Sequence, residues 1–188
     1  MTLEVSRLAI EGPLLIAPDR HVDPRGFFSE TYNAHALADA GVREIFVQDN
    51  HSMSRERGTV RGLHYQVPPR AQAKLVRVTQ GLIFDVFVDI RKSSPTYGQY
   101  GTVELGEENW QQLYMPVGFA HGFCTLEPNT EVIYKTTEFY SAQAERGIRW
   151  NDPELAINWP ACAGASLSPK DLLLPMFETV TSPFIYAG

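Results

Sequence analysis

Short runs of alternating apolar and polar residues recur along the chain, separated by turns rich in glycine, proline, aspartate and asparagine. The clearest runs cover residues 60–66, 74–79, 82–89, 100–105 and 130–140, and weaker runs cover 3–17, 27–32, 45–49, 111–115 and 122–126. Side chains alternate between the two faces of a β-strand, so each run predicts a strand. About ten such strands with regularly spaced turns predict a mainly β fold, a sandwich or jelly roll.

Two short segments depart from this pattern and predict helices. Asn33 is suited to cap a helix through residues 34–40, which ends at Gly41. Ser168 is suited to cap a second helix within residues 166–176. Both helices are too short to form a layer of their own.

The most polar of the predicted strands is residues 60–66, which follow a loop predicted over residues 50–58. Alternation puts Arg61 on one face of this strand, and His64 and Gln66 on the other. A strand with a histidine and a glutamine on one face could line a polar pocket. Taken alone, however, a single histidine on a strand is more often a hydrogen-bonded structural residue than a catalyst.

Composition narrows the classes of function. The 188 residues suit one domain, expected over residues 1–188, and the net charge of −6 argues against general nucleic-acid binding. No apolar run approaches the ~20 residues of a membrane span, so no membrane partner is expected. The N-terminal residues lack the pattern of a signal peptide, which predicts a cytoplasmic protein. Cys124 and Cys162 give no disulfide framework or zinc spacing, and Cys124 is expected to be a core residue.

Two motifs resemble those of the cupin superfamily, whose members are double-sheet jelly rolls. Gly58 followed by His64 resembles the first motif, and Pro116, Gly118 and His121 resemble the second. The resemblance therefore implies a cupin-type jelly roll in which the two histidines share a pocket.

The metal ligands of that superfamily are only partly present. In metal-binding cupins the first motif carries a second histidine and then a glutamate. Here Gln66 takes the place of the second histidine, and no glutamate lies between Gln66 and Gly81. Glutamine is a poor transition-metal ligand beside histidine and carboxylate, so no catalytic metal is expected.

The chain resembles one metal-free cupin family, dTDP-4-dehydrorhamnose 3,5-epimerase, over nearly its whole length. The matching segments are residues 23–30, 48–52, 61–66, 74–78, 85–91, 94–98, 116–123 and 147–153. The resemblance implies inversion of C3 and C5 of a 6-deoxy-4-keto hexose attached to dTDP. It implies that no metal and no redox cofactor take part. It also implies that the protein assembles as a homodimer.

The resemblance also implies catalytic roles for four residues. His64 would be the base, because an imidazole titrates near neutral pH. Asp171 would fix its tautomer, Lys74 would stabilise the enolate oxygen, and Tyr134 would return the proton from the opposite face. From the residues alone, a helix-terminal carboxylate is the more common role for a residue such as Asp171, and a solvated strand lysine is the usual case for Lys74. Tyr134 could equally be a core aromatic.

The substrate-binding residues that the resemblance implies are Arg25, Phe28, Glu30, Gln48, Asn50, Arg61, His121, Tyr140, Glu145 and Lys170. Tyr140 would stack on the thymine, although the adjacent Phe139 leaves open which ring does so. Strand alternation puts Tyr134 and Tyr140 on the same face. Two other readings remain: a 3- or 5-epimerase acting on a related dTDP sugar, and a non-catalytic cupin that binds a sugar nucleotide.

Overall fold

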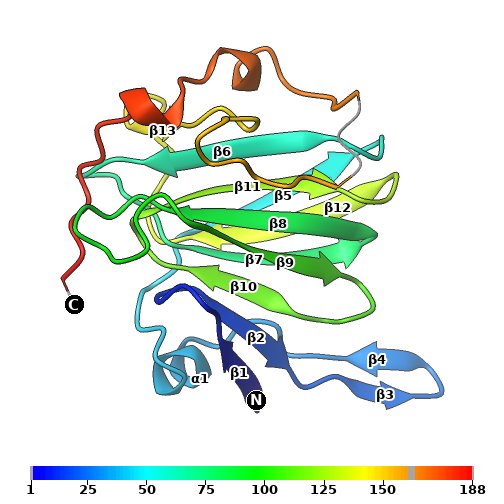
Figure 1. Ribbon diagram of the computed structural model, residues 1–188. Helices are drawn as coiled ribbons and strands as arrows, with labels where there is room; N and C mark the ends of the chain where they lie inside the picture. The colour runs from blue at the N-terminus through cyan, green and yellow to red at the C-terminus, as the bar shows by residue number, and fades with distance from the viewer. Residues whose placement is uncertain (1, 161–163, 188) are drawn as a thin grey trace.

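The computed structural model describes residues 2–160 and 164–187 and consists mainly of two antiparallel β-sheets packed face to face (Figure 1). The six-stranded sheet contains, in spatial order, β1 (Leu3–Arg7), β2 (Leu14–Pro18), β10 (Gln112–Met115), β7 (Lys74–Gln80), β12 (Thr130–Thr136) and β5 (Gln48–Ser54). The five-stranded sheet contains β13 (Glu145–Gly147), β6 (Val60–Gln66), β11 (Phe119–Thr125), β8 (Leu82–Asp89) and β9 (Tyr100–Gly106). Most neighbouring strands are distant in sequence, as is typical of a jelly roll, and the predicted mainly β fold is confirmed.

The remaining elements lie outside these two sheets. They are the hairpin of β3 (His21–Asp23) and β4 (Gly26–Phe28), the helix α1 (Ala34–Asp39), and the 3₁₀ turns η1 (Asp171–Leu173) and η2 (Phe177–Thr179). The hairpin extends away from the sheets beyond β2 (Figure 1). The predicted N-cap of α1 is confirmed, because Asn33 Oδ1 accepts hydrogen bonds from the amides of His35 and Ala36 at 3.0 and 3.1 Å.

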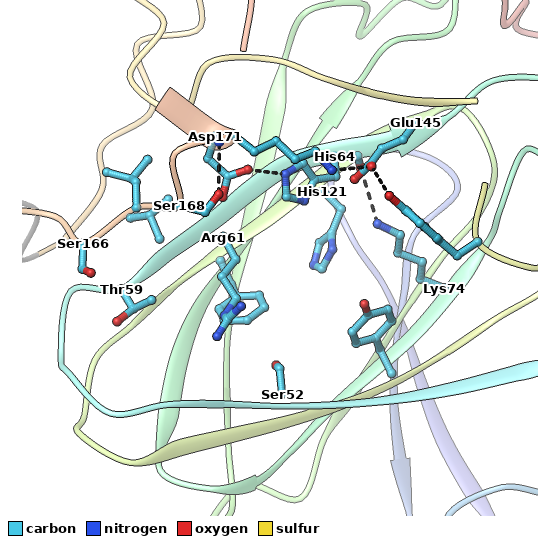
Figure 2. A pocket seen from close by; sticks show the side chains of 16 residues that line it. Ser52, Thr59, Arg61, His64, Lys74, His121, Glu145, Ser166, Ser168 and Asp171 are labelled. Atoms are coloured by element: carbon cyan, nitrogen blue, oxygen red, sulfur yellow. Dashed lines mark hydrogen bonds and ion pairs between the residues drawn. The ribbon is translucent and has the colours of Figure 1, made fainter. Parts of the chain in front are cut away.

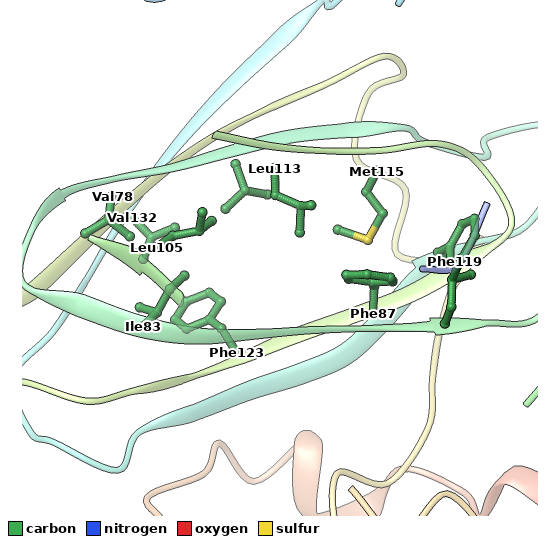
Figure 3. Close-up of a cluster of buried hydrophobic side chains, with 11 residues drawn as sticks. Val78, Ile83, Phe87, Leu105, Leu113, Met115, Phe119, Phe123 and Val132 are labelled. Atoms are coloured by element: carbon green, nitrogen blue, oxygen red, sulfur yellow. The ribbon is translucent and has the colours of Figure 1, made fainter. Parts of the chain in front are cut away.

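An apolar core fills the space between the sheets (Figure 3). The six-stranded sheet contributes Val76, Val78, Leu113, Met115 and Val132, and the five-stranded sheet contributes Ile83, Phe87, Leu105, Phe119 and Phe123. The C-terminal segment, orange to red in Figure 1, covers the outer face of the five-stranded sheet and buries Val86 and Val88. Both faces of β8 are therefore covered, which explains its nearly continuous apolar sequence. Cys124 is fully buried, as predicted.

The loop predicted over residues 50–58 is wrong in its first half, because β5 continues through Ser54. Ser52, within the predicted loop, pairs with Val132 of β12 and so belongs to the six-stranded sheet. Along β5 the more buried side chains alternate with exposed ones, as in any strand with one covered face. The part of the strand beyond residue 49 escaped prediction because its covered side chains, Asn50, Ser52 and Ser54, are polar.

Several other predicted boundaries also shift. The predicted strands 27–32, 122–126 and 130–140 become Gly26–Phe28, Phe119–Thr125 and Thr130–Thr136, and the helix predicted within 166–176 is only the turn Asp171–Leu173. The strand β12 ends early because the backbone of residues 138–141 bonds to glutamine side chains instead of a neighbouring strand. Tyr140 therefore lies beyond the strand, so alternation along β12 does not set its side, although Tyr134 and Tyr140 line the same cavity as predicted.

A register shift between β6 and β11 changes the faces predicted for β6. His121 pairs with His64 and Phe123 pairs with Arg61, so two residues of β6 lie opposite the single Gly122 of β11. The extra residue forms a bulge, which reverses the alternation of side chains. Arg61 and His64 consequently line the same cavity, although simple alternation predicts opposite faces.

Gly62 is the residue that makes this bulge possible. Its φ is +125°, and a Cβ atom added there would lie 2.6 Å from both Gly122 Cα and His121 O. We expect Gly62→Ala to lower the free energy of unfolding by at least about 3 kcal/mol, because it combines a strained φ with a backbone clash. Gly41→Ala is the matched control, since Gly41 also has a positive φ but open space around it. Equal urea midpoints for the two variants would contradict this account.

Candidate active site

A cavity of about 510 Å³ lies between the two sheets beside the core (Figure 2). Its walls include nine of the fourteen predicted site residues: Arg61, His64, Lys74, His121, Tyr134, Tyr140, Glu145, Lys170 and Asp171. Its volume lies within the usual range for small-molecule sites. The cavity therefore unites residues from both sheets and from the C-terminal segment.

His64 and Asp171 form a close pair at one wall of the cavity (Figure 2). The distance from His64 Nε2 to Asp171 Oδ1 is 2.6 Å, although 107 positions separate the residues in sequence. Burial raises the pKa of Asp171, but hydrogen bonds from His64, Ser168 and the Gly62 backbone outweigh burial and lower it overall. The ionised carboxylate keeps a proton on Nε2, which leaves the Nδ1 lone pair as the basic atom of the ring.

Tyr134 lies on β12 of the six-stranded sheet, whereas His64 lies on β6 of the five-stranded sheet. The two side chains line the same cavity from opposing sheets. Burial raises the pKa of the Tyr134 phenol, and the Arg61 guanidinium opposes this effect. The phenol therefore keeps its proton at neutral pH and is available as a proton donor.

Lys74 brings a positive charge to the same cavity. It lies at the start of β7, and its Nζ donates a hydrogen bond to the His64 carbonyl oxygen at 3.4 Å (Figure 2). Burial lowers the pKa of Lys74 to about 8, while the Asp85 and Glu145 carboxylates act in the opposite direction. The ammonium is thus largely protonated at pH 7 and loses its charge near pH 8.

This pKa predicts the alkaline side of the pH profile. If the reaction needs the Lys74 cation, kcat/KM should fall as pH rises through about 8, because deprotonation removes the charge. The Tyr134 phenol titrates at higher pH and does not cause this fall. In Lys74→Arg the guanidinium stays charged, so the fall near pH 8 should disappear even if the overall rate is lower. If kcat/KM of Lys74→Arg still fell near pH 8, the fall would belong to a group other than Lys74.

His121 is paired with an aspartate that the sequence analysis did not identify. Its Nε2 lies 3.0 and 2.9 Å from the two carboxylate oxygens of Asp85, a fully buried residue of β8. Burial lowers the pKa of His121 and raises that of Asp85, and their mutual attraction opposes both changes. His121 and His64 are cross-strand partners, so the His121–Asp85 pair lies next to the His64–Asp171 pair, whose aspartate comes from η1.

A chain of polar contacts borders the cavity near Tyr140. The Tyr140 hydroxyl donates to Glu145 Oε2 at 2.7 Å, and Lys170 forms an ion pair with the same oxygen. Burial raises the pKa of Glu145, but the bonds from Lys170 and Tyr140 lower it overall. The Tyr140 side chain is 56% exposed, whereas the equally exposed Phe139 does not line the cavity. Of these two rings, only Tyr140 lines the cavity.

Gln48 and Asn50 lie behind the cavity wall rather than on it. Gln48 Oε1 accepts a hydrogen bond from the Tyr140 amide at 3.0 Å, and its Nε2 donates to Asn50 Oδ1 at 2.8 Å. Asn50 Nδ2 in turn donates to the Tyr134 carbonyl at 3.3 Å. In this structure, both residues support the backbone of the two cavity tyrosines.

Arg25, Phe28 and Glu30 do not line the cavity of their own chain. Arg25 lies at the tip of the β3–β4 hairpin, where its side chain is 90% exposed and bonds to Asp23. Phe28, at the end of β4, is 70% exposed. Glu30 follows the hairpin and accepts a hydrogen bond from Asn33 Nδ2 at 3.0 Å.

Sequence reasoning missed part of the cavity lining, namely Ser52, Thr59, Val60, Phe123, Ser166, Leu167 and Ser168. Ser52 could have been found if β5 had been recognised, because alternation places it on the same face as Gln48 and Asn50. Ser166 and Ser168 carry no periodic signal. They reach the site because Ser166 forms a parallel bridge with Thr59 at the start of β6.

Gln66 occupies the position at which metal-binding cupins carry their second histidine. Its amide nitrogen and its amide oxygen both form hydrogen bonds within the protein. Its Nε2 donates to the Arg70 and Phe139 carbonyls, and its Oε1 accepts from the Ser141 amide. In residues 2–160 and 164–187, no group of three histidine, cysteine, aspartate or glutamate side chains is arranged to hold a metal ion. Over the same residues, no helix has the length and apolar character to cross a membrane.

Comparisons with known proteins all indicate one family. The family model for dTDP-4-dehydrorhamnose 3,5-epimerase matches residues 7–179. The curated enzyme of that name from Pseudomonas aeruginosa is 51% identical over 170 residues, covering 90% of this chain and 93% of the relative.

Two solved structures agree with this match. A Bacillus anthracis dTDP-4-dehydrorhamnose 3,5-epimerase with TDP and PPi bound superposes with a TM-score of 0.91 at 50% identity, covering 93% and 99% of the two chains. A Legionella pneumophila dTDP-6-deoxy-D-glucose-3,5-epimerase in complex with dTDP-4-keto-L-rhamnose gives 0.94 at 40% identity, covering 99% and 100%.

Proposed function

Because the chain belongs to the dTDP-4-dehydrorhamnose 3,5-epimerase family, we propose that it inverts C3 and C5 of dTDP-4-dehydro-6-deoxy-D-glucose to give dTDP-4-dehydro-L-rhamnose. Both carbons lie beside the C4 ketone, so their protons are acidic. Inversion needs a base on one face of the sugar and an acid on the other. One observation carries the proposal: His64 and Tyr134 line a single cavity from opposing sheets, and the Lys74 ammonium lies in the same cavity.

The geometry supports one sequence of proton transfers. His64 Nδ1 removes the proton next to the ketone, and Asp171 stabilises the imidazolium that forms. The negative charge then moves to the C4 oxygen, where the Lys74 ammonium stabilises the enolate. Tyr134 donates its proton to the opposite face, which inverts the carbon. Before the second inversion, the imidazolium loses its proton and the phenolate regains one through solvent.

The nucleotide end of the substrate would be held by charge and by stacking. Arg61 and Lys170 line the cavity and supply positive charge for a diphosphate, and a guanidinium is able to bind two phosphate oxygens at once. The exposed Tyr140 ring offers a surface on which a thymine could stack. These features also suit a non-catalytic binding protein, but binding alone does not need a base and an acid on opposing walls.

We also propose that the protein works as a homodimer in which the β3–β4 hairpin of one chain reaches the cavity of its partner. The hairpin lies away from its own cavity and exposes Val22, Phe27 and Phe28 by 70%, 54% and 70%. Exposed apolar side chains gathered on one element mark an interaction surface. A twofold dimer would present both hairpins in the same way, so that Arg25 contacts substrate in the partner's cavity.

Mixing two inactive variants tests this arrangement. Arg25→Ala leaves the cavity of its own chain intact, and His64→Ala leaves the hairpin intact. After subunit exchange, each mixed dimer should hold one complete site, which restores about a quarter of the wild-type sites. If Arg25 served its own cavity, mixing would restore nothing, and that result would refute the cross-chain arrangement.

Product analysis tests the reaction itself. The protein is incubated with dTDP-4-dehydro-6-deoxy-D-glucose, the mixture is reduced with borohydride, and the sugars are released by acid. Inversion of both carbons should give rhamnose and 6-deoxytalose, whereas untouched substrate gives 6-deoxyglucose and fucose. Recovery of 6-deoxyallose and 6-deoxygulose would show a 3-epimerase instead. If only 6-deoxyglucose and fucose were recovered, the protein would not be an epimerase on this substrate, and the alternative of a non-catalytic binding protein would stand.

A further inference from the structure

Gln66 lies two residues after the base on β6 and is 4% exposed, yet it does not line the cavity. We propose that Gln66 is a positioning residue: its amide holds the backbone around Tyr140, so that the Tyr140 ring stands at the cavity ready to bind the nucleotide of the substrate. The inference rests on the proposed function, because it assigns the nucleotide of that substrate to Tyr140.

The hydrogen bonds of Gln66 flank Tyr140 on both sides. Its Nε2 donates to the Phe139 carbonyl at 3.2 Å, and its Oε1 accepts from the Ser141 amide at 2.7 Å. A third bond, from Nε2 to the Arg70 carbonyl at 2.6 Å, fixes the orientation of the amide. One side chain therefore forms hydrogen bonds with the backbone of the residues immediately before and after the tyrosine.

These contacts replace the support that a strand would give. The strand β12 ends at Thr136, so residues 139–141 have no ladder of backbone hydrogen bonds. The Tyr140 amide itself donates to Gln48 Oε1 on β5. Three consecutive backbone positions are thus held by two glutamine side chains from different sheets.

Packing alone would not hold the Tyr140 ring, because its side chain is 56% exposed. Its hydroxyl contacts Glu145, but that contact restrains only the tip of the ring. If the backbone tethers are lost, the ring should sample other positions. Apparent affinity then falls in proportion to the fraction of molecules in the binding-competent arrangement.

The chemistry of the site requires an amide. Gln66 donates two hydrogen bonds to carbonyl oxygens and accepts one from an N–H group, which only an amide of this length supplies. A glutamate would keep the acceptor but place a negative charge against two carbonyls. A methionine would keep the volume and lose all three bonds.

The test measures dTDP affinity by calorimetry and steady-state kinetics in the full-length protein. We expect Gln66→Met to raise the dTDP Kd and the KM about tenfold while kcat changes less than about twofold. Gln66→Glu, whose side chain is nearly equal in shape, should likewise raise Kd and KM with little change in kcat. This second variant keeps the test possible if Gln66→Met does not fold. Gln72→Met is the matched control, because Gln72 tethers the loop farther away, at the Glu138 carbonyl. It should leave Kd nearly unchanged.

A double-mutant cycle with Tyr140→Ala separates positioning from general structural damage. If Gln66 acts through the Tyr140 ring, adding Gln66→Met to Tyr140→Ala should not weaken dTDP binding further. Additive losses, a wild-type Kd in both Gln66 variants, or a fall in kcat at constant KM would each overturn the inference. Failure of the wild-type protein to bind dTDP would instead count against the proposed function.

Discussion

Replacement of His64 by alanine should reduce solvent exchange at C3 and C5 by at least about a thousandfold, because the variant has no base near the acidic protons. The structure favours His64 because Asp171 holds a proton on Nε2, which leaves Nδ1 to accept one. The measurement is the rate of deuterium incorporation into dTDP-4-dehydro-6-deoxy-D-glucose in heavy water, followed by nuclear magnetic resonance.

His51→Ala is the control for the loss of a histidine. His51 lies on β5 and pairs with Glu131 at 3.0 Å, outside the cavity. This variant should exchange at nearly the wild-type rate. If His64→Ala kept more than about a tenth of the wild-type exchange, His64 would not be the base.

Replacement of Tyr134 by phenylalanine should separate exchange from inversion. With the phenol gone, His64 still removes a proton and returns one to the same face, so deuterium enters without inversion. We expect inversion to fall about a hundredfold more than exchange does, within the range for loss of a general acid. The Tyr134 ring also packs against the core, and phenylalanine preserves that packing.

Tyr114→Phe controls for the removal of a tyrosine hydroxyl. The Tyr114 hydroxyl bonds to Glu44 at 2.6 Å, and the residue packs in the cluster that α1 covers, outside the cavity. Its variant should keep the wild-type ratio of inversion to exchange. Equal losses of both activities in Tyr134→Phe would remove Tyr134 from the acid role.

Local sequence patterns predicted the fold wherever a strand has an apolar side. The strands β7, β8 and β9 were predicted almost to the residue, because their inward side chains belong to the core. The strand β5 was partly missed because its covered side chains are polar. The site itself therefore disturbs the periodicity on which prediction depends.

The site was predicted by family resemblance more than by pattern. Alternation put Arg61 and His64 on opposite faces, and only the pairing of β6 with β11 reveals the bulge that unites them. Asp85 was missed because its role depends on His121, which is far away in sequence. The hydrogen bonds of Gln66 also join distant segments, so a local pattern could not reveal them.

The central claim is that a base and an acid on opposing walls of this cavity invert two carbons without the help of a metal ion. It is tested most directly by incubating the wild-type protein with dTDP-4-dehydro-6-deoxy-D-glucose in heavy water, with and without a chelator, and locating the deuterium by nuclear magnetic resonance. The account predicts deuterium at both C3 and C5, at the same rate in both samples. No deuterium at either carbon, or exchange that the chelator abolishes, would contradict it.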